Sequence, residues 1–243
     1  MKGKTTMSQL NERVIVVTGG AGGMGLAIAR ALKERGARVI ATDLREPQDP
    51  IDGVEFARHD ITSERDWDTV IASAIDRFGR LDGLVNNAGW GELAPFQQTE
   101  TEMFEKTLRV NQIGTFLGMK KAAEAMKDKG GAIVNIASCV SMRGVAGQFA
   151  YSTSKWAVRG MTKCAALDLA AHGIRVNSVN PGPTDTPMIA AFPGEMRAAV
   201  QSMIPMGRFG DPREIAATTA FLLSDDASYI TGAEVEVDGG FFA

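Results

Sequence analysis

The amino-acid sequence predicts a single α/β domain, a doubly wound parallel sheet of about seven strands with helices on both faces. Three observations support this fold class. Short apolar runs alternate with longer helical patterns along the chain, as in repeated strand–helix–strand units. The runs are continuously apolar, which is typical of strands that are covered on both faces. No Pro/Ser-rich linker or internal repeat divides the 243 residues, a length that suits one large domain.

The first expected strand, residues 13–18, reads RVIVVT and is rich in β-branched residues. A helical pattern follows, in which Met24, Ile28 and Leu32 recur every four residues. Further strands are expected at residues 37–42, 54–57, 81–86, 132–137, 174–179 and 234–237. Long helical stretches are expected around residues 101–127 and 152–171.

Residues 185–205 interrupt this alternation. The segment follows the sixth expected strand, and its apolar residues are irregularly spaced. Because a long segment in this place is commonly a lid, we expect it to cover a substrate site. Residues 1–10 are expected to form a flexible tail before a catalytic domain at 11–243, and either Met1 or Met7 is the native start.

The composition limits the possible functions. The formal net charge is -3 and the basic residues are spread along the chain, which argues against nucleic-acid binding. No apolar run reaches the roughly 18 residues of a membrane span, and no signal peptide is recognisable. Cys139 and Cys164 suit reduced thiols in a cytoplasmic protein. His59 and His172 lack ligand spacing, so no metal site is expected.

A glycine-rich run from Thr18 to Gly25 joins the first expected strand to the first helix. Glycines there allow a tight turn and close approach of the backbone to a pyrophosphate. The helix N-terminus adds free N–H groups and a partial positive charge. No Lys-Ser or Lys-Thr pair follows, so the run is not the phosphate loop of an NTPase. Its place between a buried strand and an amphipathic helix predicts a dinucleotide site.

Asp43 lies just past the second expected strand, about 20 residues after the glycines begin. A carboxylate there can accept hydrogen bonds from both hydroxyls of an adenosine ribose. It would repel a 2′-phosphate by about 1–4 kcal/mol at about 4 Å. We therefore favour NAD as the cofactor, while Arg45, which could accommodate that phosphate, leaves NADP open.

Tyr151 and Lys155 are four residues apart and would share one face of a helix. An ammonium beside the phenol would help to lower the phenol pKa from its usual value near 10. Ser138 lies upstream, after an expected strand. Each residue alone is typical of a helix surface or cap. Their occurrence together with the dinucleotide turn predicts hydride transfer, with Tyr151 as general acid and base.

On these residues the chain resembles the short-chain dehydrogenase/reductase family, from residue 14 to residue 240. The motifs that carry the resemblance are, in order, the Thr18–Gly25 run, Asp60, Asn86-Asn87-Ala88-Gly89, Asn111, Ser138, Tyr151 with Lys155, Asn180-Pro181-Gly182, and Thr231-Gly232-Ala233 with Asp238-Gly239-Gly240. The resemblance implies a Rossmann fold and a nicotinamide cofactor. Within the family, the chain looks most like bacterial NAD-dependent secondary-alcohol and hydroxysteroid dehydrogenases.

The resemblance also implies roles for particular residues. The catalytic residues it implies are Asn111, Ser138, Tyr151 and Lys155. The implied cofactor-binding residues are Gly19, Gly23, Met24, Gly25, Asp43, Leu44, Asp60, Ile61, Asn87, Ala88, Gly89, Tyr151, Lys155, Pro181, Gly182, Thr184 and Thr186. Ser138 would hydrogen-bond the substrate oxygen and Lys155 would hold the nicotinamide ribose. Asn111 would anchor a water that connects Lys155 to solvent.

The expected substrate site carries little charge, which suits an uncharged ligand. The residues expected to contact substrate are Ser138, Val140, Gln148, Tyr151, Met188 and Phe192. They predict a neutral secondary alcohol or its ketone, hydrophobic or cyclic. Two alternatives stay open: an NADPH-dependent 3-oxoacyl-thioester reductase, and a non-catalytic cofactor-binding sensor.

The resemblance further implies a homotetramer. The helical stretches 101–127 and 152–171 are candidates for a dimer seam. Phe241 and Phe242 end the sequence, and exposed aromatic area there would be a liability. We expect another subunit or a nearby groove to cover both rings.

Overall fold

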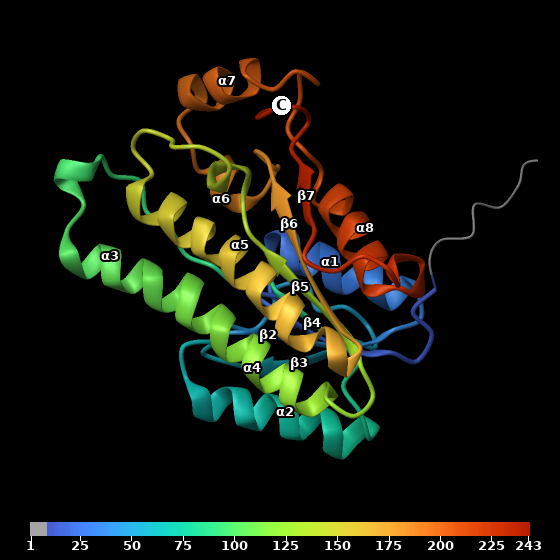
Figure 1. Ribbon diagram of the computed structural model, residues 1–243. Coiled ribbons are helices and arrows are strands. Elements are labelled where there is room, and N and C mark those ends of the chain that lie inside the picture. Colours follow the sequence, from blue (N-terminus) through green and yellow to red (C-terminus); the bar gives the residue numbers. More distant parts are fainter. Residues whose placement is uncertain (1–8) are drawn as a thin grey trace, which may run out of the picture.

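The computed structural model describes residues 9–243 (Figure 1). At its centre lies one seven-stranded sheet, in the order β3-β2-β1-β4-β5-β6-β7, with all neighbouring strands parallel. The strands are β1 (Val14–Thr18), β2 (Arg38–Asp43), β3 (Glu55–Arg58), β4 (Gly83–Asn86), β5 (Gly131–Ile136), β6 (Ile174–Pro181) and β7 (Glu234–Val237). Every expected strand is present, with ends shifted by no more than two residues. The predicted fold class is confirmed.

Helices fill the connections between the strands. They are α1 (Gly23–Glu34), α2 (Glu64–Phe78), α3 (Thr101–Leu108), α4 (Gly114–Met126), α5 (Phe149–Leu169), α6 (Pro187–Ala190), α7 (Gly194–Ser202) and α8 (Pro212–Leu223). A π-helix, Arg109–Ile113, joins α3 to α4 without a break, so the expected 101–127 stretch is one continuous rod. Short 3-10 turns lie at Phe96–Gln98, Cys139–Ser141, Ala170–His172 and Asp225–Ala227.

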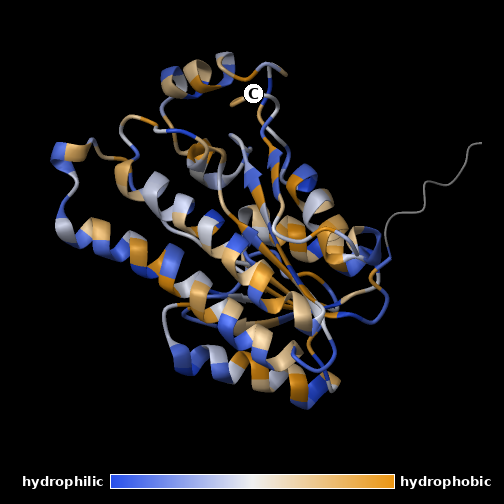
Figure 2. Cartoon of the chain, in the orientation of Figure 1, coloured by the Kyte–Doolittle hydropathy of each residue, from blue (hydrophilic) through white to orange (hydrophobic). Residues whose placement is uncertain are grey.

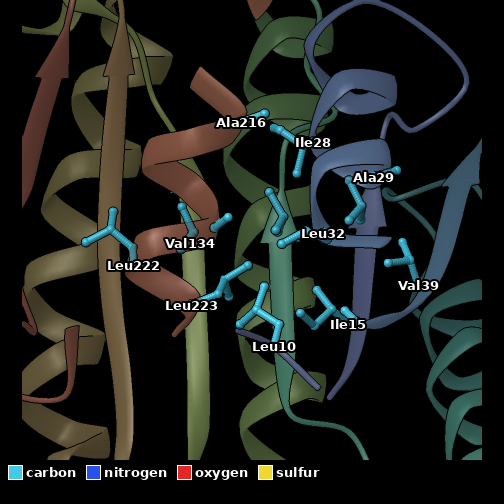
Figure 3. Packing of buried hydrophobic residues seen from close by; sticks show 14 of the residues in the cluster. Leu10, Ile15, Ile28, Ala29, Leu32, Val39, Val134, Ala216, Leu222 and Leu223 are labelled. Atoms are coloured by element: carbon cyan, nitrogen blue, oxygen red, sulfur yellow. The ribbon is translucent and has the colours of Figure 1, made fainter. Parts of the chain in front are cut away.

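Two hydrophobic clusters hold the layers together, one on each face of the sheet. On one face α1 and α8 pack over β1 and its neighbours through residues such as Ile28, Leu32 and Ala216 (Figure 3). On the other face α2, α4 and α5 bury a second cluster around Trp67. The hydropathy colouring shows apolar strands in the middle and polar outer helix faces (Figure 2). Burial on both faces explains why the strands are continuously apolar in the sequence.

The strand order reverses between β1 and β4. Ile15 pairs with Val39 of β2 on one side and with Gly83 of β4 on the other. The chain connections therefore leave in opposite directions on the two sides of β1. In open α/β sheets, ligands bind outside the carboxyl ends of the strands at such a reversal. The glycine turn follows β1 at that point.

Leu10, which we assigned to the tail on sequence grounds, packs against the domain. Its side chain is fully buried in the cluster on the α1 and α8 face of the sheet, and its N–H donates to the Arg35 carbonyl. Met1 and Met7, the two candidate starts, lie outside the described residues.

The segment 185–205 forms α6 and α7, which stand off the sheet beside the carboxyl end of the chain (Figure 1). None of the residues of α7 is buried. The last residues of the chain pack against the end of this segment: a Cβ at Gly239 would lie 3.0 Å from Ile204 and one at Gly240 3.2 Å from Pro205. The segment is thus held at its base and exposed along its helix.

Phe241 and Phe242 are half-buried. Their ring centroids lie 4.8 Å apart, and the Arg143 guanidinium lies 4.0 Å from the Phe242 centroid. The two rings and Arg143 therefore cover part of one another.

Across residues 9–243, no helix combines the length and apolarity that a membrane crossing needs. Over the same residues, no group of three or more His, Cys, Asp or Glu side chains could hold a metal ion.

Candidate active site

The glycine turn brings the backbone of β1 and α1 into close contact. Gly19 has a φ of +67°, a conformation that side chains disfavour. A Cβ at Gly25 would collide with the Gly19 carbonyl oxygen. Only glycine at position 25 therefore lets the first turn of α1 lie this close to Gly19. The N-cap of α1, Gly22, offers no side-chain hydrogen bond, and a Cβ there would meet nothing within 4 Å. The turn fits a pyrophosphate, because the first N–H groups of a helix have no partner within the helix and the space beside Gly22 is open.

Two side chains fix this turn to the end of β4. The Thr18 hydroxyl accepts hydrogen bonds from the N–H groups of Asn87 and Ala88, each at 3.0 Å. The Asn87 amide donates to the carbonyls of Thr18 and Gly19, at 2.9 and 3.3 Å. The predicted residues 87–89 are therefore brought beside the glycine turn at the strand-order reversal.

Asp43 is the last residue of β2 rather than the residue after it. One carboxylate oxygen accepts a 3.3 Å hydrogen bond from the Ala21 N–H of the glycine turn, and the other a 3.4 Å bond from the Arg45 N–H. Both bonds are long, which leaves the half-buried carboxylate able to accept hydroxyl groups. Leu44 is exposed beside it. This arrangement fits an adenosine ribose.

The two residues expected at the adenine lie after β3. The Asp60 carboxylate accepts hydrogen bonds from the N–H and the hydroxyl of Thr62, at 2.9 and 2.8 Å. Ile61 is buried, and its side chain packs where Gly114 of α4 leaves room. The Asp60 carboxylate thus stabilises a local turn, and Ile61 next to it belongs to the core.

Tyr151 and Lys155 lie in the first two turns of α5, as the spacing predicted, and Ser138 follows β5. Burial of the phenol raises the pKa of Tyr151 to about 12. The nearby Ser138 side chain acts in the opposite direction and lowers this pKa by a smaller amount. The net shift is opposite to the lowering that we expected from the sequence.

Lys155 explains part of the difference. Its Nζ donates a 2.8 Å hydrogen bond to the Ile136 carbonyl and lies 5.8 Å from the centroid of the Tyr151 ring. The side chain is buried, and burial lowers the pKa of Lys155 to about 8. Burial therefore disfavours the charged form of this amine. A Cβ added at Gly89 would lie 3.4 Å from Lys155 Nζ, so this amine lies beside residues 87–89.

Asn111 lies inside the π-helix and is fully buried. Its side chain holds the backbone of Trp90 in both directions, accepting from the N–H and donating to the carbonyl, each at 2.8 Å. It also donates to the Ser154 hydroxyl at 2.8 Å. Asn111 therefore ties the stretch after Gly89 to α5. A π-bulge is a common feature of functional sites, since it redirects one residue of a helix.

The residues expected at the nicotinamide end follow β6. Pro181 is the last residue of β6, and the Gly182 backbone lies so close to Asp238 that a Cβ would approach its Cα within 2.5 Å. Thr184 is buried and donates to the Gly182 carbonyl at 2.9 Å. Thr186 is the N-cap of α6 and lies 3.9 Å from where Gly23 would carry a Cβ. The start of the segment 185–205 thus lies beside the glycine turn.

The structure brings only part of the expected substrate set together. Val140 is buried next to Ser138, and Gln148 pairs with Ala94 through a backbone bridge. Phe192, in the segment 185–205, is half-buried. The Met188 side chain lies outside the described part of the structure, although its backbone belongs to α6.

Sequence reasoning missed Gly91. A Cβ at this position would lie 2.5 Å from Cδ2 of the Tyr151 ring, so the glycine leaves the space that the ring occupies. Its only sequence signal is its place, two residues after the Asn86–Gly89 motif.

Comparisons with known proteins agree with this geometry. A family model described as Enoyl-(Acyl carrier protein) reductase matches residues 19–242. The chain is 38% identical to trans-4-hydroxycyclohexanecarboxylate dehydrogenase of Sinomonas cyclohexanicum, over 94% of this chain and 92% of the relative. It is 39% identical to cyclopentanol dehydrogenase of Comamonas sp. (strain NCIMB 9872), over 98% of this chain and all of the relative. The crystal structure of gox2181 superposes with a TM-score of 0.92 at 33% identity, covering 96% of both chains.

Proposed function

Because the chain belongs to the short-chain dehydrogenase/reductase family, we propose that it is an NAD-dependent dehydrogenase of a cyclic or otherwise hydrophobic secondary alcohol. The chain is an oxidoreductase that acts on CH–OH groups, and its family uses a nicotinamide cofactor. One observation carries the proposal furthest. Ser138, in the turn after β5, lies near Tyr151 at the start of α5, and β1 of the same sheet leads into a glycine turn that fits a dinucleotide.

In this proposal Tyr151 takes the hydroxyl proton of the alcohol as hydride leaves the carbinol carbon. Ser138 donates a hydrogen bond to the same substrate oxygen and holds it at the phenol. An oxidised nicotinamide, when bound, would supply the hydride acceptor. The glycine turn and Asp43 would hold its dinucleotide part, and Lys155 its nicotinamide ribose.

The Tyr151 pKa must fall for this proton transfer to work near neutral pH. Burial sets it at about 12 in the protein, and Ser138 already acts to lower it. A positive charge brought beside the phenol favours the phenolate, as does a charged Lys155. We therefore expect the Tyr151 pKa to drop when oxidised cofactor binds, and turnover to rise with pH until the phenolate forms.

Replacement of Tyr151 by Phe tests the mechanism. The variant keeps the ring and loses the proton acceptor, so kcat with NAD and cyclohexanol or cyclopentanol should fall by about 10²–10⁴-fold. Binding of NAD, followed by quenching of tryptophan fluorescence, should be retained. If Tyr151→Phe bound NAD and still turned over near the wild-type rate, the proposed mechanism would be wrong.

The preference for NAD rests on Asp43, which would meet a 2′-phosphate with like charge. The initial rate should be higher with NAD than with NADP. In Asp43→Ser the ratio of the NAD rate to the NADP rate should fall by about 10-fold or more. Equal rates in the wild type would overturn the preference.

The cyclic substrate class is supported by the relatives, two of which are named as dehydrogenases of cyclohexane- or cyclopentane-based alcohols. Val140, buried beside Ser138, offers an apolar contact for such a ring. A 3-oxoacyl-thioester reductase would instead turn over an acyl thioester with NADPH. A substrate panel in which only acyl thioesters react would replace our proposal with that one.

We further propose a homotetramer in the cytoplasm. Among the described residues both cysteines are free, Cys139 buried and Cys164 exposed, which suits a reducing compartment. Exposed apolar side chains on α4 and α5 support a subunit contact there, as described below.

A further inference from the structure

The turn that carries Ser138 is anchored to the helix that carries Tyr151. Ser138 opens a 3-10 turn, Cys139–Ser141, in which the Ser141 hydroxyl and N–H both bond the Ser138 carbonyl, at 2.5 and 3.0 Å. Two side chains of α5 then reach this turn. Trp156 Nε1 donates to the Val140 carbonyl at 3.3 Å, and an Arg159 guanidinium nitrogen donates to the Ser141 carbonyl.

Arg159 is itself held from the opposite side. Its second terminal nitrogen pairs with a Glu234 carboxylate oxygen at 2.6 Å, and Lys163 Nζ lies 3.5 Å from the other oxygen. The Arg159 and Glu234 side chains are only 18% and 14% exposed. The guanidinium thus bridges three elements: α5, the Ser138 turn and the edge strand β7.

An ion pair that is largely removed from water is costly to form, and an apolar pair of the same size would often be at least as stable. Stability alone therefore gives no clear reason for placing an arginine here. The arginine does supply a rigid, two-armed donor that spans a carbonyl and a carboxylate at fixed spacing.

The reaction of the proposed function needs that spacing. Ser138 and Tyr151 must contact one substrate oxygen, yet they come from different elements, the turn after β5 and the helix α5. A misplacement of about 1 Å between reacting groups can cost about 100-fold in rate. Whatever fixes the turn to the helix therefore fixes the reacting geometry.

We propose that Arg159, held by Glu234, is a positioning residue that fixes the Ser138 turn to α5 and so keeps the Ser138 hydroxyl beside Tyr151. The inference rests on the proposed function, in which these two hydroxyls share the substrate oxygen. Arg159 touches neither substrate nor cofactor in this role, since it acts through the Ser141 carbonyl.

Titration of Tyr151 tests this directly, because the chain has only two tyrosines and the other, Tyr229, is fully exposed. Protein labelled with 13Cζ-tyrosine and bound to NAD would give two NMR signals, with Tyr229 as an internal reference. The charged and polar groups that face Tyr151 are Ser138, Cys139 and Lys155, and none is altered by the variants. In Arg159→Met the Tyr151 midpoint should rise by about one unit, the value of one lost hydrogen bond to the phenolate.

Kinetics of the same variants complete the test. In Arg159→Met, kcat for cyclohexanol should fall about 10–100-fold and KM for NAD should stay unchanged. Arg159→Lys, which keeps one donor, should restore part of the rate. Glu234→Ala should act in the same direction, and the double variant should be no worse than Arg159→Met, because both act through one turn.

Arg13 provides a matched control, since it also bridges a backbone carbonyl, that of Leu223, and a carboxylate, that of Asp225, at the opposite end of the sheet. Arg13→Met should lower the melting temperature and leave the Tyr151 midpoint unchanged. An Arg159→Met variant that loses stability but keeps the wild-type Tyr151 midpoint and kcat would overturn the inference. The titration needs no substrate, so a wild-type protein that oxidises no cyclic alcohol would overturn only the proposed function.

Discussion

The position of the Tyr151 ring depends on neighbours that lack a side chain as well as on residues that contact the ring. Gly91 is the clearest case, because the Tyr151 ring fills the space where a side chain would begin. The ring is thus confined between α5, the Ser138 turn and a glycine backbone.

Substitution of Gly91 by Ala should therefore push the Tyr151 ring out of place. A Cβ would begin 2.5 Å from the ring carbon, and the shift should lower kcat by about 10–100-fold. NAD affinity, measured by fluorescence quenching, should change little. Gly144→Ala is the control, because a Cβ at Gly144 would meet nothing within 4 Å. Equal kcat values for the two variants would contradict this account.

His59 controls stability in acid rather than the reaction. The ring is buried edge-on against Trp67, at 4.4 Å, and its Nδ1 lies 3.0 Å from the Thr42 hydroxyl. Within the described residues Nε2 has no hydrogen-bond partner. Burial lowers the pKa of His59 to about 4, although Asp66 and Asp60 act to raise it.

The folded-state pKa of His59 lies below the usual value of 6.5, so the unfolded chain takes up the proton first. The stability that neutral His59 contributes is complete above pH 6.5 and is lost as pH falls toward 4. The loss should reach about 2 kcal/mol at pH 5 and about 3 kcal/mol at pH 4. Urea unfolding of His59→Gln should show a smaller decrease over this range, whereas exposed His172→Gln should follow the wild type.

At the residue scale, the sequence predicted what is local and missed what is tertiary. The four-residue spacing placed Tyr151 and Lys155 on one helix, and the structure has both in α5. Their pKa values depend on burial and on where each polar group points. Lys155 directs its amine to the Ile136 carbonyl, and no local pattern shows that contact or those of Gly91 and Arg159.

At the scale of the secondary-structure elements, capping residues determine where the helix α8 begins. α8 begins at a capping box: the Asp211 carboxylate accepts from the Arg213 N–H, and the Glu214 carboxylate accepts from the Asp211 N–H, each at 2.8 Å. Pro212 occupies the first helical position, where no N–H is needed. α8 covers one face of the sheet, so its start supports the whole α1-side cluster.

Loss of this cap should destabilise the fold without altering the site. Asp211→Ala should lower the free energy of unfolding by about 1 kcal/mol, a drop of about 2–4 °C in melting temperature for a chain of this length. Asp211→Asn keeps a capping acceptor and should differ from the wild type by only a few tenths of a kcal/mol. If both variants melted alike, the capping hydrogen bond would not be the cause.

Element positions were predictable because burial on both faces leaves a continuous apolar run for each strand. The π-helix at Arg109–Ile113 was not predictable, because its sequence continues an ordinary helical pattern. Its cause lies elsewhere in the chain: Asn111 bonds the Trp90 backbone, a contact between segments that only the folded sheet brings together.

For the whole molecule, exposed apolar area remains on the outer helices. α4 and α5 lie side by side (Figure 1), with Phe116 46% and Trp156 49% exposed. Area of this kind is usually covered by a partner. A homotetramer in which these helices meet their copies would cover it.

Light scattering at micromolar concentration should therefore report a tetramer for the wild type. Phe116→Glu should yield smaller species, because a charge would be buried in the proposed seam. Ile75→Glu, at an exposed apolar position on α2, should leave the tetramer intact. A monomeric wild type would refute the assembly.

The strand order also determines when each strand can find its neighbours while the chain is being synthesised. β1 takes its second neighbour from β4, which leaves the ribosome only after β2, β3 and α2 have emerged. Until Gly83 pairs with Ile15, the nascent chain carries an apolar strand with one unpaired edge, a template for association with other chains. We therefore expect fragments that stop before β4 to aggregate and to depend on chaperones, whereas chains that extend well beyond β4 can close this edge.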